Sequence, residues 1–389
     1  MTIPAMTSYE RVQKALNHEE PDKIPFDLGG TMVTGINIIA LRNLKKYLGL
    51  DKPARVKDVI TQMAETDEEL TDRLRIDVKN VGPKVPGKSR LKDLGKRDGC
   101  HFVEDEWGMQ WKKPLSGGHY YDLHKSPLAF VETIKDVDNY PWPDAYDPFR
   151  YEDLKKEADK IVFEDEKACF LGRMSAGMWE HAMWMTGYEK FMTDMYVNPG
   201  VVQAIMEKIL QIKMDYWERA LEAVGNNVMV ASTADDLGTQ TSLLVSLDMY
   251  KAQIWPYHKR LFDFIKKKAR ADVKIFFHND GAIMETIPLL IEAGVDILNP
   301  FQVNCRGMDT KEFKRLYGKD LTIWGGSCDT QYVLPYGTVQ EVKDETMRRI
   351  DDLAPGGGFI FAPIHNIQSG VPPENIMAWW ETLQTFGQY

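Results

Sequence analysis

Cysteine is scarce in this sequence of 389 residues, which contains only Cys100, Cys169, Cys305 and Cys328. No two of them form a Cys-x-x-Cys pair. So few thiols argue against a disulfide framework and favour a reducing compartment, so we expect a cytoplasmic protein. Long apolar runs are absent as well. No stretch of about 18 apolar residues predicts a membrane span, and the N-terminus lacks the apolar segment of a signal peptide.

Basic residues are fewer than acidic ones. The sequence contains 48 lysines and arginines and 58 aspartates and glutamates, which gives a net charge of −10. This balance argues against nucleic acid as the main partner. Hydrophobic residues make up 43% of the chain, enough for a large core at this length. No linker, low-complexity tract or repeat interrupts the sequence, so we expect a single domain over residues 1–389.

From about residue 160, short apolar runs alternate with amphipathic stretches, which implies parallel strands joined by right-handed helical crossovers. The pattern predicts an α/β fold of the (β/α)8 TIM barrel type. An open doubly wound sheet is the competing architecture, but no glycine-rich dinucleotide turn follows the first strand. The expected strands are residues 168–171, 228–231, 273–277, 297–298, 321–324 and 359–361, and the expected helices are residues 202–223, 249–269, 283–293 and 339–353.

Residues 1–150 are expected to supply the first strands together with N-terminal helical and hairpin additions, before the regular β/α units of residues 151–389. The patterns predict a helix over 9–16, helical spacing over 34–50 and 56–75, a strand over 76–81 and hairpins over 98–125.

Polar or small residues follow each expected barrel strand, on the face where barrel active sites are built. His278 and Asp280 form a His-x-Asp pair there, and His365 would approach from the end of the last strand. Two imidazoles and a carboxylate with an open position suit a catalytic zinc, which would polarise an ether oxygen. The alternative is a hydrogen-bonded strand-end His278, with Asp280 capping a helix that begins near residue 282.

Asp235 and Asp236 follow another expected strand and are candidate catalytic groups. Adjacent carboxylates there would act as general acid and base or hold a cationic intermediate, although one of them would equally cap a turn. Arg173 is a candidate for binding a substrate carboxylate through a bidentate pair, and an internal salt bridge is the alternative.

Glu180 and Trp179, near the start of an expected helix, are candidate substrate-binding residues. Ordinary core packing is the alternative for any single tryptophan, including Trp107, Trp111 and Trp184. Cys328 would be a thiolate ligand or, more simply, an inert buried thiol.

Two end segments make the sequence resemble the uroporphyrinogen decarboxylase superfamily, with central motifs at residues 278–281 and 294–296 between them. The first segment runs from Arg11 through His18-Glu19-Glu20-Pro21-Asp22-Lys23-Ile24-Pro25, and the second from Gly356-Gly357-Gly358-Phe359 through His365-Asn366 to Asn375-Ile376. The resemblance implies a (β/α)8 barrel, often a homodimer, with one of two chemistries. These are cofactor-free decarboxylation of uroporphyrinogen and zinc-dependent methyl transfer involving a corrinoid protein.

One departure from the family patterns argues against the decarboxylase, and a second changes the ligands of the metal site that the methyltransferases use. The decarboxylases carry an Arg-Gln-Ala-Gly-Arg loop that grips the carboxylates of the substrate, whereas residues 27–32 here contain no arginine. The methyltransferases usually hold zinc with a His-x-Cys pair and a later cysteine, and the matching positions here are His278, Asp280 and His365. No Asp-x-His-x-x-Gly cobalamin motif occurs, so a corrinoid would arrive on a separate protein.

The resulting hypothesis is a methyltransferase that moves a methyl group from a small donor, plausibly an aryl methyl ether, to the corrinoid of a partner protein in O-demethylation. Asp235 or Asp236 would orient the substrate or supply a proton. One alternative is decarboxylation of a tetrapyrrole or smaller acid with help from His365. Another is a non-catalytic barrel that binds a corrinoid or tetrapyrrole.

Overall fold

Seven parallel strands form the main sheet of the computed structural model, which describes residues 6–86 and 91–389. In sheet order they are β13 (Phe359–Ile360), β12 (Thr322–Trp324), β11 (Ile297–Asn299), β10 (Lys274–His278), β9 (Val230–Ala234), β8 (Ala168–Leu171) and β3 (Val78–Val81). Each strand pairs in parallel with its neighbours, as the alternation of apolar runs and helices predicts.

Residues 24–28 lie between the two edge strands and bring them together. Phe26 forms a parallel bridge with Phe361, and the amide of Phe361 donates to the Pro25 carbonyl at 2.9 Å. On the other side, the amide of Asp77 donates to the Phe26 carbonyl at 2.8 Å. The segment therefore takes the place of an eighth strand, and the predicted TIM barrel fold is confirmed.

Aromatic side chains fill the inside of the barrel. Phe170, Phe276 and Trp324 meet edge-on, with ring centroids 5.0 to 5.7 Å apart. The Trp324 indole N–H donates to the buried carboxylate of Asp27 at 2.8 Å. The interior formed by the described residues is therefore a packed core, and a large cavity lies toward the C-terminal ends of the strands.

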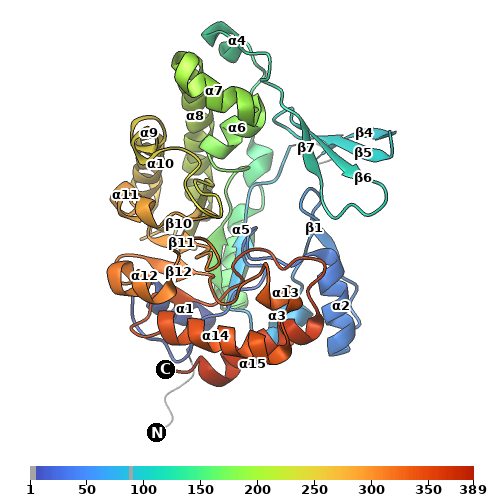
Figure 1. Cartoon of the computed structure of the whole chain (residues 1–389), viewed down its shortest axis with the longest axis vertical. Helices are drawn as coiled ribbons and strands as arrows, with labels where there is room; N and C mark the ends of the chain where they lie inside the picture. Colours follow the sequence, from blue (N-terminus) through green and yellow to red (C-terminus); the bar gives the residue numbers. More distant parts are fainter. Residues whose placement is uncertain (1–5, 87–90) are drawn as a thin grey trace.

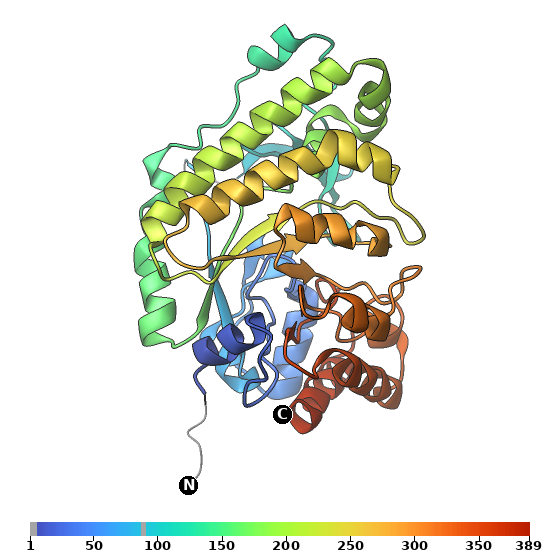
Figure 2. The same ribbon diagram turned by 90° about the vertical axis from the view of Figure 1, so that its left-hand side faces the viewer.

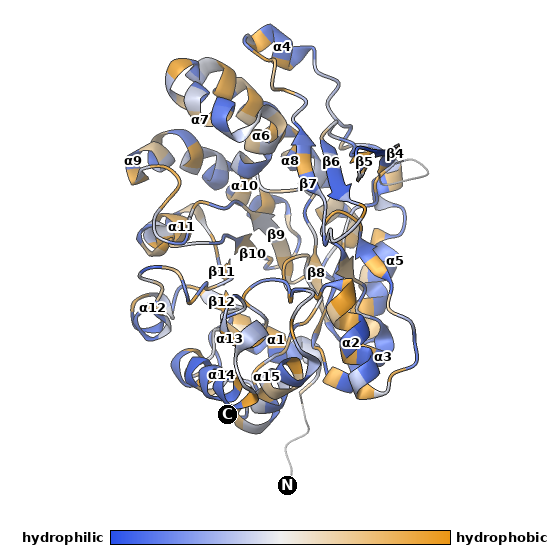
Figure 3. Cartoon of the chain, turned by 45° about the vertical axis from the view of Figure 1, so that its right-hand side comes forward, coloured by the Kyte–Doolittle hydropathy of each residue, from blue (hydrophilic) through white to orange (hydrophobic). Residues whose placement is uncertain are grey.

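Helices pack around the outside of the barrel (Figures 2 and 3), and the longer ones bury apolar residues along one face. The main helices are α5 (Leu154–Asp159), α6 (Trp179–Thr186), α7 (Tyr188–Val197), α8 (Pro199–Val224), α10 (Trp255–Lys268), α11 (Ile287–Ala293), α12 (Thr310–Tyr317), α14 (Val339–Leu353) and α15 (Pro373–Phe386). Among the described residues, no helix is both long and apolar enough to cross a membrane.

The antiparallel sheet of the N-terminal additions stands to one side of the barrel (Figure 1). The predicted hairpins form an antiparallel sheet of four strands, β4 (Lys92–Arg97), β5 (Cys100–Glu104), β6 (Gln110–Pro114) and β7 (Asp122–Lys125). The helices of this part are α1 (Ser8–Leu16), α2 (Ile38–Leu48), α3 (Glu68–Leu74) and α4 (Ile134–Asp138).

The helix predicted over residues 56–75 is wrong in its first half. The structure has β1 (Val56–Asp58) and β2 (Met63–Ala64) there, and only α3 is helical. The Asp58 carboxylate accepts from the amide and the hydroxyl of Thr61, both at 2.7 Å, and so closes a turn. The Asp67 side chain then caps α3, so the apolar residues at helical spacing belong to a short hairpin.

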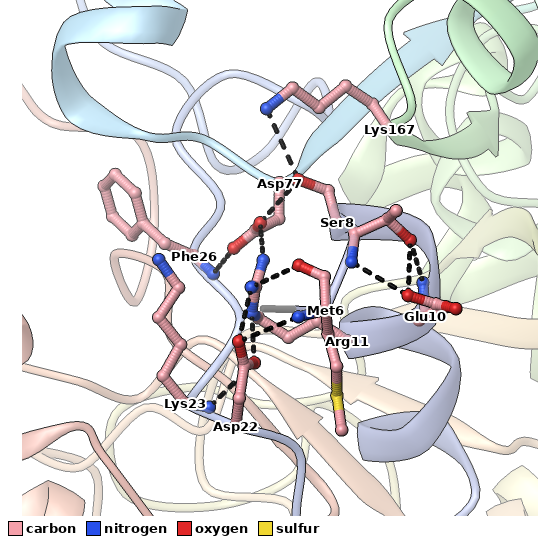
Figure 4. A network of polar contacts seen from close by, with 10 residues as sticks. Met6, Ser8, Glu10, Arg11, Asp22, Lys23, Phe26, Asp77 and Lys167 are labelled. Carbon is pink, nitrogen blue, oxygen red and sulfur yellow. Dashed lines mark hydrogen bonds and ion pairs between the residues drawn. The ribbon is translucent and has the colours of Figure 1, made fainter. Parts of the chain in front are cut away.

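A buried polar network ties α1 to the barrel at its N-terminal side (Figure 4). The Arg11 guanidinium donates to Asp22 at 2.7 and 2.8 Å and to Asp77 at 2.7 Å. Asp77 also accepts from the Ser8 hydroxyl at 2.7 Å and from the Phe26 amide at 2.9 Å. The motif at the start of the sequence therefore serves to close the barrel, and it lies outside the residues that line the cavity.

Candidate active site

A cavity of about 1030 Å³ opens between the C-terminal ends of the barrel strands and the N-terminal additions. Five of the predicted site residues line it: Arg173, Glu180, Asp236, His278 and His365. Each follows or ends a different strand except Glu180, which lies in the first turn of α6. The barrel topology therefore gathers residues that are up to 192 positions apart in the chain.

His278 and His365 line this cavity, and Asp280 comes together with them beside it. One ligand atom from each lies within 4.8 Å of the others. The ring centroids of the two histidines are 5.5 Å apart, and His365 Nε2 lies 3.8 Å from Asp280 Oδ2. This is the only such cluster of three His, Cys, Asp or Glu residues that the described part of the chain contains.

Asn299 fixes the orientation of the His278 ring. The Asn299 amide nitrogen donates to the Trp324 carbonyl at 2.6 Å, so its oxygen must accept from His278 Nδ1 at 2.6 Å. His278 Nε2 is then left as the free acceptor of a neutral imidazole. Burial, with His365 and Arg173 nearby, lowers the pKa of His278 well below its usual value and keeps the ring neutral.

The loop after β10 places Asp280. Its backbone amide donates to Asp236 Oδ1 at 2.9 Å, and Gly281, with a φ of 104°, turns the chain away immediately afterward. Asp280 Oδ1 is buried and has no hydrogen-bond partner among the described residues. A buried carboxylate oxygen without a partner, beside two imidazoles, is a suitable metal ligand.

Carboxyl groups near this cluster have raised pKa values. Burial, and then the neighbouring Asp280 carboxylate, raise the pKa of Asp236 to about 7. Burial raises the pKa of Asp280 to about 7. Burial, followed by Asp236 and Asp235, raises the pKa of Glu180 well above its usual value. The cavity therefore holds carboxylic acids that retain a proton near neutral pH.

Asp235 is placed differently from Asp236. Its carboxylate is fully buried and accepts from the amides of Met178, Trp179 and Glu180 at 3.1, 3.1 and 2.8 Å, and from His258 Nε2 at 2.6 Å. It caps α6 and does not line the cavity, whereas Asp236 does. The two positions could not be told apart from the sequence, because both residues directly follow β9, which ends at Ala234.

The other candidates divide between the cavity and the core. Arg173 lines the cavity, donates to the Ser232 hydroxyl at 2.9 Å and keeps a buried Nε without a partner among the described residues. Trp179 is fully buried in the core, outside the cavity lining. Cys328 is likewise buried, and burial raises the pKa of its thiol, which suits an inert side chain.

An aromatic wall, made of Trp107, Trp111, Tyr121 and Trp184, lines the side of the cavity formed by the antiparallel sheet and α6. Trp111 donates its indole N–H to Asp105 at 2.8 Å and Trp184 donates to the Tyr188 hydroxyl at 2.6 Å. Their rings meet edge-on at 5.6 Å. Because both indole N–H groups are already bonded, the rings present apolar surface.

The comparisons with known proteins agree with this fold. The family model for uroporphyrinogen decarboxylase (URO-D) matches residues 127–386. Curated relatives named uroporphyrinogen decarboxylase include the protein of Trichlorobacter lovleyi, 24% identical over 182 residues, which are 46% of this chain and 48% of that protein. The protein of Geobacter sulfurreducens is 24% identical over 195 residues, 50% of this chain and 52% of its own. The chain thus spans about half the length of the curated relatives it matches.

A methyltransferase from Methanosarcina mazei has a similar structure over almost the whole chain. The TM-score is 0.63 and the alignment covers 98% of this chain and 99% of that one, at 16% sequence identity. At this identity the likeness concerns the fold, including the N-terminal additions that form one side of the cavity.

Proposed function

The chain belongs to the uroporphyrinogen decarboxylase family, and on this premise we propose that it is a methyltransferase. It would move a methyl group from a small donor, an aryl methyl ether, to a corrinoid held by a separate protein, and it would work as a homodimer in the cytoplasm. One observation carries the proposal: two neutral imidazoles that line the cavity converge with the Asp280 carboxylate, one oxygen of which has no hydrogen-bond partner among the described residues.

His278, Asp280 and His365 would hold a zinc ion. The donor set of two nitrogens and one oxygen matches catalytic zinc sites, which keep an open position for substrate. When bound, zinc supplies Lewis acidity that stabilises negative charge on an ether or alcohol oxygen. A carboxylate and two imidazoles are harder ligands than thiolates, so the site suits an oxygen atom better than a sulfur atom.

The aromatic wall would bind the aryl body of the donor, with its methoxy group directed toward the histidines. Trp111 and Trp184 are held by their indole N–H groups, so the rings are preorganised to pack against a flat apolar ligand. Arg173, with its spare donors, would bind an anionic substituent or the charge that develops on the leaving oxygen.

Asp236 and Glu180 would provide the proton that the leaving oxygen needs. The methyl carbon–oxygen bond breaks, the oxygen retains the bonding electron pair, and a proton from one of these carboxylic acids yields the neutral alcohol. The corrinoid of the partner supplies the nucleophile that accepts the methyl group. Asp235, which caps α6, is not assigned a proton-transfer role.

Decarboxylation of uroporphyrinogen is the second candidate, favoured by the names of the curated relatives. The cavity wall formed by residues 28–33 opposes it. Leu28, Gly29, Gly30, Met32 and Val33 line the cavity there without a cation, so any cations for a substrate with many carboxylates would come from other lining residues, such as Lys57, Lys79 and Arg173.

The test is an assay of both reactions with the same zinc-supplemented protein. Methoxyarenes and reduced free corrinoid should yield a methylated corrinoid and the corresponding phenol, and the rate should fall at least about a hundredfold in Asp280→Ala. Loss of carbon dioxide from uroporphyrinogen, at equal rates in wild type and Asp280→Ala, would refute the proposal. Binding of corrinoid without either reaction would support a non-catalytic barrel.

A further inference from the structure

The first turn of α6 is held by residues from other parts of the chain. Met178, at the N-cap position, provides no capping hydrogen bond of its own. Asp235, 55 positions or more along the chain, accepts from three successive amides at this helix end. The approach is so close that a Cβ on Gly177 would lie 2.0 Å from Asp235 Oδ1.

His258 is the second partner of this buried carboxylate. Its Nε2 lies 2.6 Å from Asp235 Oδ2, and the two side chains are 1% and 0% exposed. Tyr250 contacts His258 Nδ1 through its hydroxyl at 3.2 Å. The His258 ring is stacked on Phe262 and meets Phe277 edge-on, so its position is fixed from both sides.

The tautomer follows from the partners. A carboxylate that already accepts three amide hydrogen bonds can only accept from His258, so Nε2 carries a hydrogen. Asp235 Oδ2 accepts from His258 Nε2 and from the amides of Met178 and Trp179, so removal of the His258 donor would take away one of the three hydrogen bonds that hold this buried oxygen. The chain Tyr250–His258–Asp235 therefore ends at the amide of Glu180.

We propose that His258 is a positioning residue that acts through Asp235 to hold the first turn of α6, so that the Glu180 side chain faces the cavity. The inference rests on the proposed function, in which Glu180 lies beside the reacting oxygen. His258 lies outside the cavity lining, and it therefore contributes by orientation rather than by contact with a substrate. No sequence signal identifies it, because it occupies a buried position of an ordinary amphipathic helix.

The loop before α6 is supported in the same manner from α8. Lys213 donates to the carbonyls of Met174 and Ala176 at 3.0 and 2.6 Å, and Tyr216 donates to the Gly172 carbonyl. These contacts hold the loop that carries Arg173 independently of His258. Loss of His258 should therefore displace Glu180 while Arg173 stays in place.

The proposal is tested by the titration of Glu180, which needs neither methyl donor nor corrinoid. Full-length protein is labelled with 13C at the glutamate carboxyl carbons, and the Glu180 resonance is assigned by its loss in Glu180→Gln. Several charged or titratable groups surround Glu180. They are Arg173 in the loop before α6, Asp235 and Asp236 after β9, Asp280 after β10, Lys213 on α8 and Tyr188 on α7.

His258→Leu should lower the Glu180 midpoint by about one pH unit or more, because a released α6 turn exposes the carboxyl group to water. His258→Gln, whose amide nitrogen can replace Nε2 as a donor, should restore the wild-type midpoint. His258→Phe, which keeps an aromatic ring but offers no donor to Asp235, should shift the midpoint in the same direction if His258→Leu does not fold.

Arg11→Met is the matched control, because it destabilises the protein at the opposite end of the barrel. It should leave the Glu180 midpoint unchanged. A wild-type midpoint in both His258→Leu and His258→Phe would overturn the proposal, as would an equal shift in Arg11→Met. A shift restored by His258→Gln in a protein that transfers no methyl group would reject the proposed function and retain the positioning role.

Discussion

Asp280 is the residue that should make metal binding dependent on pH. Its pKa of about 7 in the metal-free protein lies above that of an unperturbed aspartate, so a proton must leave before the carboxylate can bind zinc. His278 and His365 have lowered pKa values and are already neutral there.

Zinc affinity should therefore fall about tenfold for each pH unit below 7 and level off above it. Competition with a chelator between about pH 5.5 and 8.5 measures this slope. Asp280→Asn, which removes the titrating group, should bind more weakly and with a flatter profile. An identical slope in the two proteins would assign the proton to another residue.

Asn299 offers a second test on the scale of single residues. Asn299→Leu removes the acceptor that fixes the His278 ring, and zinc affinity should fall about 10- to 100-fold. Asn299→Asp keeps an oxygen beside Nδ1 and should stay near wild type. The comparison is made by chelator competition at one pH, and equal losses in both variants would show that the tautomer of His278 is unimportant.

The link between α1 and the barrel depends on Arg11. Its side chain is 6% exposed and pairs with Asp22 and with Asp77, which is 3% exposed. Arg11→Met leaves the Asp77 carboxylate buried without its cation, so the free energy of unfolding should fall by roughly 3 kcal/mol or more. Urea denaturation measures this change.

Lys14→Met is the control for Arg11, because Lys14 and its partner Glu19 are 39% and 57% exposed. Its effect should stay below about 1 kcal/mol. Zinc content should be unchanged in both variants, since neither residue lines the cavity. Equal stability losses would mean that burial of the network contributes nothing.

The antiparallel sheet should determine which donor binds. Trp111→Leu removes part of the aromatic wall, so KM for a methoxyarene should rise about tenfold while kcat changes little. Trp380→Leu is the matched control, because Trp380 is half-buried on α15 and donates its indole N–H to the Leu74 carbonyl at 2.9 Å, outside the cavity lining. A similar KM in all three proteins would remove the wall from the binding site.

The sequence predicts some helices and strands accurately and others poorly. The predicted strand at residues 168–171 and the helix at residues 339–353 coincide with β8 and α14, since an apolar run and an amphipathic period are local signals. The hairpin at residues 56–64 was missed because its turn depends on side-chain bonds of Asp58. The apolar spacing around it also fits a helix.

Site residues are harder to predict, because their roles depend on contacts across the barrel. His278, Asp280 and His365 stand out as strand-end residues, and the structure brings them together. The different positions of Asp235 and Asp236 depend on α6, and the roles of Asn299 and His258 depend on hydrogen bonds across 21 and 23 positions of sequence. No local pattern encodes such bonds.

At the scale of the whole molecule, the cavity is a joint product of the barrel and the additions before residue 150. The barrel supplies the polar floor with His278 and His365, and the antiparallel sheet supplies Trp107 and Trp111. Neither part alone would enclose a ligand between apolar and polar surfaces. The additions therefore line the candidate site, and if the proposed function holds, substrate specificity should follow changes in them.

The central claim is that the floor of the cavity is a zinc site, and metal content tests it most directly. Full-length protein purified without chelator should contain about one zinc per chain, and His278→Ala, Asp280→Ala and His365→Ala should each lose it. His124→Ala, which changes an exposed histidine on β7, should retain it. Folded wild-type protein without zinc, or zinc retained in all three site variants, would contradict the account.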